Sequence, residues 1–138
     1  MNKVQVQKII AIIGIVLGAV FVISGAATYL MVQQKLKAEN ISVSVDSPSY
    51  AGKAVAGPFT AFSEASMISI HALKATGGKT YAQLDKEDPL RNVAMTGSFL
   101  RASLFTSVVS FGLAAFVAGV GLMFMLFGYL ILGLEKRK

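Results

Sequence analysis

Two long apolar runs, separated by a more polar middle segment, dominate the pattern of this chain. The run 102–134 contains no Asp, Glu, Lys, Arg or His, and the run 9–32 is also uncharged. Because a helix rises about 1.5 Å per residue, about 20 apolar residues cross the hydrocarbon core of a bilayer, and both runs exceed that length. We therefore expect an all-α membrane protein whose two transmembrane helices, 9–32 and 102–134, form a hairpin.

The first run has some features of a secretory signal. Lysines precede it, and the small residues at 24–27 suit a cleavage site. The apolar stretch nevertheless continues to Val32, beyond the length of a usual signal. We expect a retained span that follows a short N-terminal segment, residues 1–8.

The middle segment, residues 33–101, carries the marks of several short elements. Apolar and polar residues alternate over about 40–46, which predicts one short strand. Gly57-Pro58 is a favourable helix start and Gly77-Gly78 a favourable stop, so the residues between them predict a helix over about 59–74. The segment is therefore expected to be mostly helical with a single strand.

Two further helix starts follow along the chain. Thr80 begins a sequence with capping-box spacing, which predicts a short helix over about 80–87. Asp88 can cap a helix with its carboxylate, and Pro89 suits the first helical position. We expect one long helix that begins at 89 and continues through the second span.

Small residues recur at helical spacing in both spans. Gly14 and Gly18 form a G-x-x-x-G pair, and the second span carries small residues at intervals of three or four. Such faces let helices approach closely, either within the chain or between chains. The expected helix-packing interface consists of Gly14, Gly18, Gly25, Ser103, Ser107, Ser110, Ala114, Ala118 and Gly121.

The predicted helix at 59–74 has a wider apolar stripe than a surface helix needs, which indicates burial against the membrane, a loop or a partner. The residues expected to dock extracytoplasmic partners are Phe59, Phe62, Ile68 and Tyr81.

The net charge is +6, and its distribution predicts an orientation. Lys3 and Lys8 precede the first span, and a basic tail at 135–138 follows the second, whereas the middle segment has mixed charge. Basic flanks favour the cytoplasmic side, so both termini are expected there and the middle segment outside. The same residues suit anionic lipid headgroups, and nucleic acid is not an expected partner because no basic patch interleaves with aromatic residues.

Residues for catalysis or metal binding are scarce. With no cysteine the chain lacks thiolate chemistry, and its one histidine, His71, has no partners at the spacing of a zinc, iron or Ser-His-Asp site. The carboxylates of Asp85, Glu87 and Asp88 could hold a hard cation weakly, but a solvated turn is the favoured interpretation. We expect no catalytic residue, no cofactor and no metal.

Two further site types are disfavoured. Gly77-Gly78-Lys79-Thr80 has the ending of a phosphate-binding loop, but Leu73 stands where the first glycine is required. Transporters usually place ionisable groups inside their spans, and these spans have none.

A longer stretch carries a family resemblance. Residues 57–114, with GPFTAF, GGKTYAQLDKEDPLR and SFLRASLFTSVV, together with AENISVSVD at 38–46, resemble a family of small actinobacterial two-span membrane proteins. Members often carry the name aromatic ring-opening dioxygenase. Such iron enzymes need two histidines and a carboxylate, and a chain with one histidine does not fit that name. The resemblance implies the plasma membrane of an actinobacterial cell envelope.

Together these observations favour a non-catalytic accessory subunit of a multi-subunit membrane complex. By analogy with actinobacterial assemblies that recruit small subunits, the expected partners are membrane subunits of the cytochrome bcc and cytochrome aa3 oxidase respiratory supercomplex in the electron transport chain. The alternative is a homo-oligomer that binds or passes lipid or a small solute. Ser103, Ser107 and Ser110 are the polar candidates for lining such a path.

Overall fold

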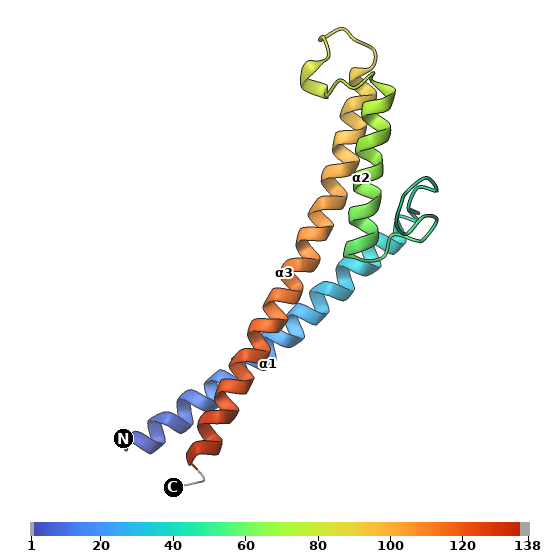
Figure 1. The fold of residues 1–138 in the computed structure, drawn as a ribbon. Helices are drawn as coiled ribbons and strands as arrows, with labels where there is room; N and C mark the ends of the chain where they lie inside the picture. The colour runs from blue at the N-terminus through green and yellow to red at the C-terminus, as the bar shows by residue number, and fades with distance from the viewer. Residues whose placement is uncertain (1, 136–138) are drawn as a thin grey trace. The chain divides into compact units, whose positions relative to one another are not determined.

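The computed structural model describes residues 2–135, and it is all-helical over that range (Figure 1). Three α-helices and one 3-10 turn make up the described chain, and no β-sheet is found in it. The chain divides into two compact units. The elements are α1 (Lys3–Ala38), α2 (Pro58–Ala75), η1 (Tyr81–Gln83) and α3 (Arg91–Glu135); the first unit is Met1–Met31 with Gly112–Lys138, and the second unit is Val32–Phe111.

Helices α1 and α3 are long and apolar enough, by length and composition, to cross a membrane. They have 36 and 45 residues, so both extend beyond the uncharged runs. Lys35 and Lys37 lie in the last turn of α1, where a positive charge is favourable at the negative end of the helix dipole. The basic tail expected at 135–138 lies outside the described residues, apart from the backbone of Glu135.

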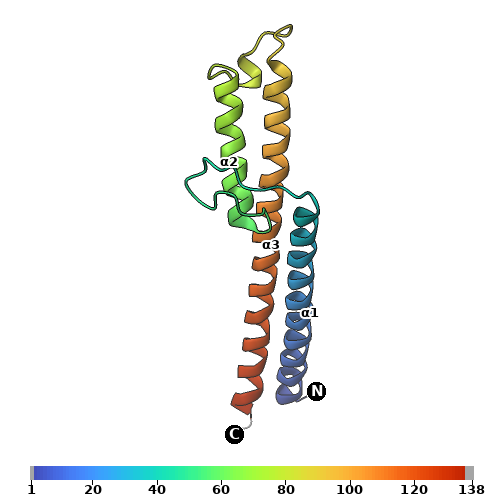
Figure 2. The ribbon, with the colours of Figure 1, turned by 90° about the vertical axis from the view of Figure 1, so that its right-hand side faces the viewer.

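In the first unit, α1 and α3 pack side by side in opposite directions (Figure 2). Gly18 lies against Gly121, and Gly25, further along α1, lies against Ala114 and Ala118. Residue numbers therefore rise along one helix as they fall along the other.

In the second unit, α2 packs antiparallel to the first turns of α3, and the two helices lie side by side in both ribbon views (Figures 1 and 2). The rings of Phe62 and Phe105 meet edge to face with centroids 5.7 Å apart. Ala61 and Ala65 of α2 are completely buried. The core between the two helices is thin, and it depends on small residues.

The ends of α2 follow from local chemistry. The Thr60 hydroxyl oxygen accepts the backbone N–H groups of Ala56 and Gly57 at 3.1 and 3.2 Å, which satisfies donors at the helix start. At the other end, Gly77 has a positive φ of 64°, and the Gly78 N–H donates to the carbonyl of Leu73 at 2.7 Å. This is the glycine-terminated Schellman arrangement. The helix expected over about 59–74 is thus observed as Pro58–Ala75.

The strand expected over about 40–46 is not present in the described chain. Ser42 forms only an isolated antiparallel bridge with Ala54. Val43 is buried, but Val45 is 88% exposed, because a turn closed by the Ser47 N–H and the Ser44 carbonyl interrupts the extended backbone. The alternation in the sequence therefore predicted the wrong conformation after Val43.

The helices predicted to begin at about 80 and at 89 have different bounds in the structure. The side chain of Gln83 accepts the Thr80 N–H at 2.9 Å, as capping-box spacing predicts, but η1 ends at Gln83 instead of about 87 because Leu84 is extended and buried. The Asp88 carboxylate accepts the N–H of Leu90 at 2.8 Å. Regular helix begins two residues later than Pro89, at the first residue of α3.

Candidate functional site

The contact between α1 and α3 in the first unit is built on glycine. A Cβ on Gly18 would lie 2.5 Å from the carbonyl oxygen of Gly121, and a Cβ on Gly121 would lie 2.6 Å from the carbonyl oxygen of Gly18. The two backbones approach this closely only because neither residue has a side chain. We call this contact the glycine seam, formed by Ala11, Gly18, Gly25, Ala114, Ala118, Gly121 and Gly128.

Five of the residues expected to pack the helices lie in the glycine seam, namely Gly18, Gly25, Ala114, Ala118 and Gly121. Gly14 lies beside it at a looser point, where a Cβ would be 3.6 Å from the carbonyl of Phe124. Sequence reasoning missed Gly128, whose added Cβ would lie 2.6 Å from the Ala11 carbonyl. Its spacing of two helical turns from Gly121 was the signal that could have identified it.

The serines expected to extend this interface, Ser103, Ser107 and Ser110, lie in α3 outside the first unit. They precede the α3 residues of the first unit and belong to the second unit. The hydroxyls of Ser107 and Ser110 donate to carbonyls one turn earlier, at 3.3 and 2.8 Å, and Ser103 supplies one of those carbonyls. Their polar groups are therefore satisfied within α3 itself.

In the second unit a buried carboxylate holds the loop that follows α1. Glu64 of α2 is only 8% exposed, and its side chain accepts both the N–H of Ser44 at 2.7 Å and the hydroxyl of Ser44 at 3.0 Å. A further hydrogen bond joins the hydroxyls of Ser47 and Ser63 at 2.9 Å. These contacts fix the loop on α2.

The one histidine lies on the same loop contact, at the surface. His71 Nε2 and Asp46 Oδ2 are 2.7 Å apart, and this hydrogen bond, with a smaller effect of the nearby Lys74 charge, lowers the pKa of Asp46. Among residues 2–135, no group of three or more His, Asp or Glu side chains is placed to hold a metal ion. The contact of His71 is therefore a surface hydrogen bond with Asp46, which joins α2 to the loop.

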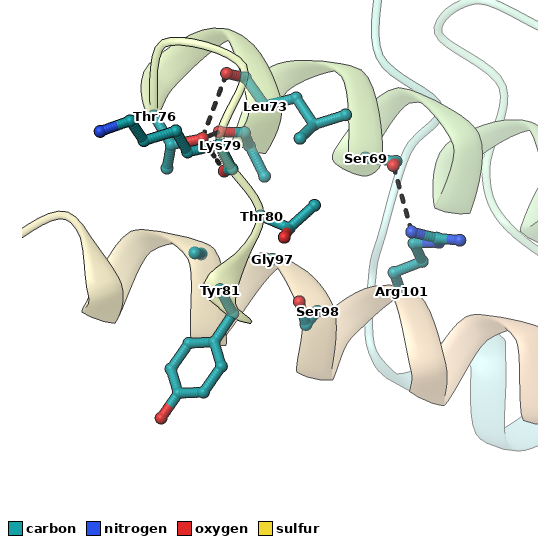
Figure 3. A pocket seen from close by; sticks show the side chains of 11 residues that line it. Ser69, Leu73, Thr76, Lys79, Thr80, Tyr81, Gly97, Ser98 and Arg101 are labelled. Carbon is teal, nitrogen blue, oxygen red and sulfur yellow. Dashed lines mark hydrogen bonds between the residues drawn. The ribbon is translucent and has the colours of Figure 1, made fainter. Parts of the chain in front are cut away.

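A small pocket with polar and apolar lining lies between α2 and α3, beside the chain that leads into η1 (Figure 3). A Cβ on Gly97 would lie 2.7 Å from the Cβ of Ala72, so the helices approach closely at that point. The volume of the pocket is about 80 Å³. We call it the Arg101 pocket, lined by Ser69, Ala72, Leu73, Thr76, Lys79, Thr80, Tyr81, Ala94, Gly97, Ser98 and Arg101.

Apolar side chains cover one exposed face of α2. They recur at intervals that place them on the same side of the helix. The exposed fraction of Phe59 is 71%, although it belongs to a unit rich in charged residues. We call this surface the α2 apolar face, formed by Phe59, Phe62, Ile70 and Leu73.

The residues expected to dock a partner are thus only partly brought together. Phe59 and Phe62 lie on the α2 apolar face, but Ile68 points to α3, with its γ2 carbon 4.0 Å from the Cβ position of Gly97. Tyr81 lies on η1, where the guanidinium of Arg91 stacks 4.0 Å from the centre of its ring. Sequence reasoning did not separate Ile68 from the exposed side of the broad stripe.

The whole sequence matches no protein-family model, no curated protein and no solved structure. The surfaces of the two units are therefore the basis for assigning a function.

Proposed function

We propose that this chain is a non-catalytic accessory subunit that crosses the plasma membrane twice and docks on another membrane protein. The observation that supports docking is the α2 apolar face. The second unit contains every acidic residue of the chain except Glu135, so it is suited to water, and a cluster of exposed aromatic and aliphatic side chains there favours a protein contact.

Membrane insertion is supported by the distribution of apolar groups in the first unit. Ile23, Phe116 and Tyr129 are each about two-thirds exposed or more, and the glycine seam occupies the inward faces. Helices that are apolar on all sides are typical of membrane spans. Lipid would then cover the outer faces of α1 and α3.

Lys3 and Lys8, which precede the first span, and the basic residues that follow the second span in the sequence support an orientation with both termini in the cytoplasm and the second unit outside. Since the chain has no cysteine, single cysteines report this directly. Ala51→Cys, in an exposed turn of the second unit, is expected to react with a membrane-impermeant maleimide in intact cells. Gln7→Cys, near the start of α1, is expected to react only after the cells are lysed, and the reverse pattern would contradict the orientation.

The resemblance to small actinobacterial two-span proteins makes subunits of the cytochrome bcc–aa3 supercomplex the first partners to test. The full-length tagged chain is solubilised in mild detergent and separated by native electrophoresis, with mass spectrometry of co-migrating proteins. The proposal predicts migration within a larger hetero-complex. Migration as the free chain, or as a ring of this chain alone, would refute it.

Polar substitutions on the α2 apolar face are expected to release the partner. Phe59→Ser combined with Ile70→Ser removes two exposed apolar groups, and the yield of co-purified partner is expected to fall about tenfold or more, as for a residue pair at the centre of an interface. Thermal stability is expected to change little because both side chains are already exposed. Quantitative mass spectrometry after affinity purification measures the yield.

Met95→Ser is the matched control. Met95 is also an exposed apolar residue of the second unit, at 51%, but it lies on α3 and outside the α2 apolar face. It is expected to leave the partner yield unchanged, and an equal loss in both variants would mean that the face is wrongly assigned.

A further inference from the structure

Arg101 is a cation without an acidic partner in the described chain. Its Nη1 donates to the hydroxyl of Ser69 at 3.2 Å, and its guanidinium lies 5.5 Å from the centre of the Phe105 ring. No Asp or Glu is among the residues that line the Arg101 pocket. The remaining N–H groups of the guanidinium are therefore free of carboxylates and able to meet an external anion.

The other polar groups of the pocket complement that charge. Ser69 and Ser98 bring two hydroxyls to the same space (Figure 3), whereas the Thr80 hydroxyl, also in the lining, donates to the side-chain oxygen of Gln83 at 3.1 Å. Hydroxyls can donate to an oxyanion, and an arginine fork suits the paired oxygens of a phosphate. The pocket volume of about 80 Å³ is several times the roughly 10–15 Å³ that one water requires, so it has room for a small tetrahedral group.

Contacts of the neighbouring residues fix the walls of the Arg101 pocket. Gly97, one of the lining residues, allows α2 and α3 to approach closely, because any side chain there would meet the Ala72 methyl. Arg91 donates to the carbonyl of Leu84 at 2.8 Å and stacks on Tyr81, which fixes the η1 side. Lys79, the other cation of the lining, extends away from Arg101 (Figure 3).

Arg101 also has a distinctive place in the sequence. It is the last ionisable residue of α3 before the uncharged run 102–134. In a helix that spans a bilayer, an arginine at such a boundary reaches toward the headgroup region. The relevant phosphate could thus belong to a lipid headgroup or to a free phosphate ion.

We propose that the Arg101 pocket binds a phosphate group, with Arg101 as its charged ligand and the hydroxyls of Ser69 and Ser98 as supporting donors. The site shares only Leu73 with the α2 apolar face, and its proposed ligands, Arg101, Ser69 and Ser98, lie outside that face. Only the lipid source of the phosphate rests on the proposed membrane insertion.

The test uses the purified full-length chain in a neutral detergent, with three probes. Phosphatidylglycerol and phosphatidylcholine with the same acyl chains are titrated and followed by native mass spectrometry. Inorganic phosphate is titrated separately and followed by thermal unfolding. Retention of phosphatidylglycerol over phosphatidylcholine indicates a lipid headgroup, and a rise in the unfolding midpoint with inorganic phosphate indicates a free ion.

Arg101→Gln is expected to lower the affinity for whichever probe the unchanged protein binds by about tenfold, since it removes a charge-assisted bidentate contact. Lys37→Gln removes one exposed positive charge at the end of α1 and is expected to bind as the unchanged protein does. Equal binding by the unchanged protein and Arg101→Gln, equal losses in both variants, or binding of none of the three probes by the unchanged protein would overturn the proposal.

A second variant covers the case in which Arg101→Gln fails to fold. Ser69→Ala combined with Ser98→Ala keeps the positive charge of Arg101 and removes two hydroxyls from the pocket, including the one that accepts the hydrogen bond of Arg101. It is expected to lower the affinity for the same probe several-fold, and unchanged affinity in a folded double variant would overturn the assignment.

Discussion

Gly121→Leu is expected to disrupt the packing of α1 on α3 in the first unit. A Cβ at this position would lie 2.6 Å from the Gly18 carbonyl oxygen, 2.9 Å from the Cβ of Phe21 and 2.9 Å from the backbone nitrogen of Val22. None of these atoms is the flexible end of a side chain, so the helices themselves must separate. We expect a cost of about 3 kcal/mol in the free energy of unfolding, at the upper end of the usual range for overpacking. Titration of SDS into the protein in mild detergent, followed by circular dichroism, measures it.

The chain offers a closely matched control, Gly119→Leu. Gly119 lies two positions earlier on the same helix, and nothing stands within 4 Å of its Cβ position. The two substitutions add the same side chain with the same gain in helix propensity over glycine. Gly119→Leu is therefore expected to leave stability unchanged or slightly higher. Equal stability of the two variants would show that the glycine seam does not hold the helices together.

The seam shows which part of such an interface a sequence can predict. Glycine and alanine at helical spacing selected Gly18, Gly25 and Gly121, and each of the three lies against the backbone of the other helix. The same periodicity also selected Ser107 and Ser110, whose hydroxyls bond within their own helix. The spacing of small residues identifies positions at which another helix can approach the backbone closely. It does not identify which helix does so.

The helices of the second unit follow from local signals, and the loop does not. Pro58 at the start of α2 and Gly77 after its end act within a few residues, so its bounds could be predicted closely. The pairing of Val43 with the backbone of Lys53 joins residues on either side of a turn. Alternating polarity alone could not reveal that the extended backbone stops there.

The docking residues show a similar limit. The broad apolar stripe of α2 predicted burial, but it could not separate Ile68, which faces α3, from Phe59, which is exposed. That distinction depends on which side of α2 meets Gly97. Periodicity gives the angle between two residues around the helix axis. Only the fold shows which side of the helix faces the core.

The second large effect is expected at Glu64, whose carboxylate joins the loop to α2. Glu64→Ala leaves the Ser44 N–H and hydroxyl without their acceptor in a mostly buried position. The expected cost is about 1–3 kcal/mol, the usual price of removing one partner of a buried hydrogen bond. Hydrogen exchange should report it as a loss of protection of roughly 5- to 160-fold at the N–H groups of Val43 and Val55, which bond across the loop.

Two further variants separate the hydrogen bond from general charge effects. Glu64→Gln keeps an acceptor oxygen at the same place and is expected to recover much of the protection. Glu87→Ala removes a carboxylate from an exposed part of the second unit and is expected to change nothing at the loop. If Glu64→Ala left Val43 as protected as before, the burial of Val43 and Val55, both 1% exposed, would be sufficient to hold the loop. The hydrogen bond joins Ser44 of the loop to Glu64 of α2, twenty positions further along the chain, so it holds the loop and not the helix. The N–H groups of the loop are therefore expected to lose protection while those of α2 keep it.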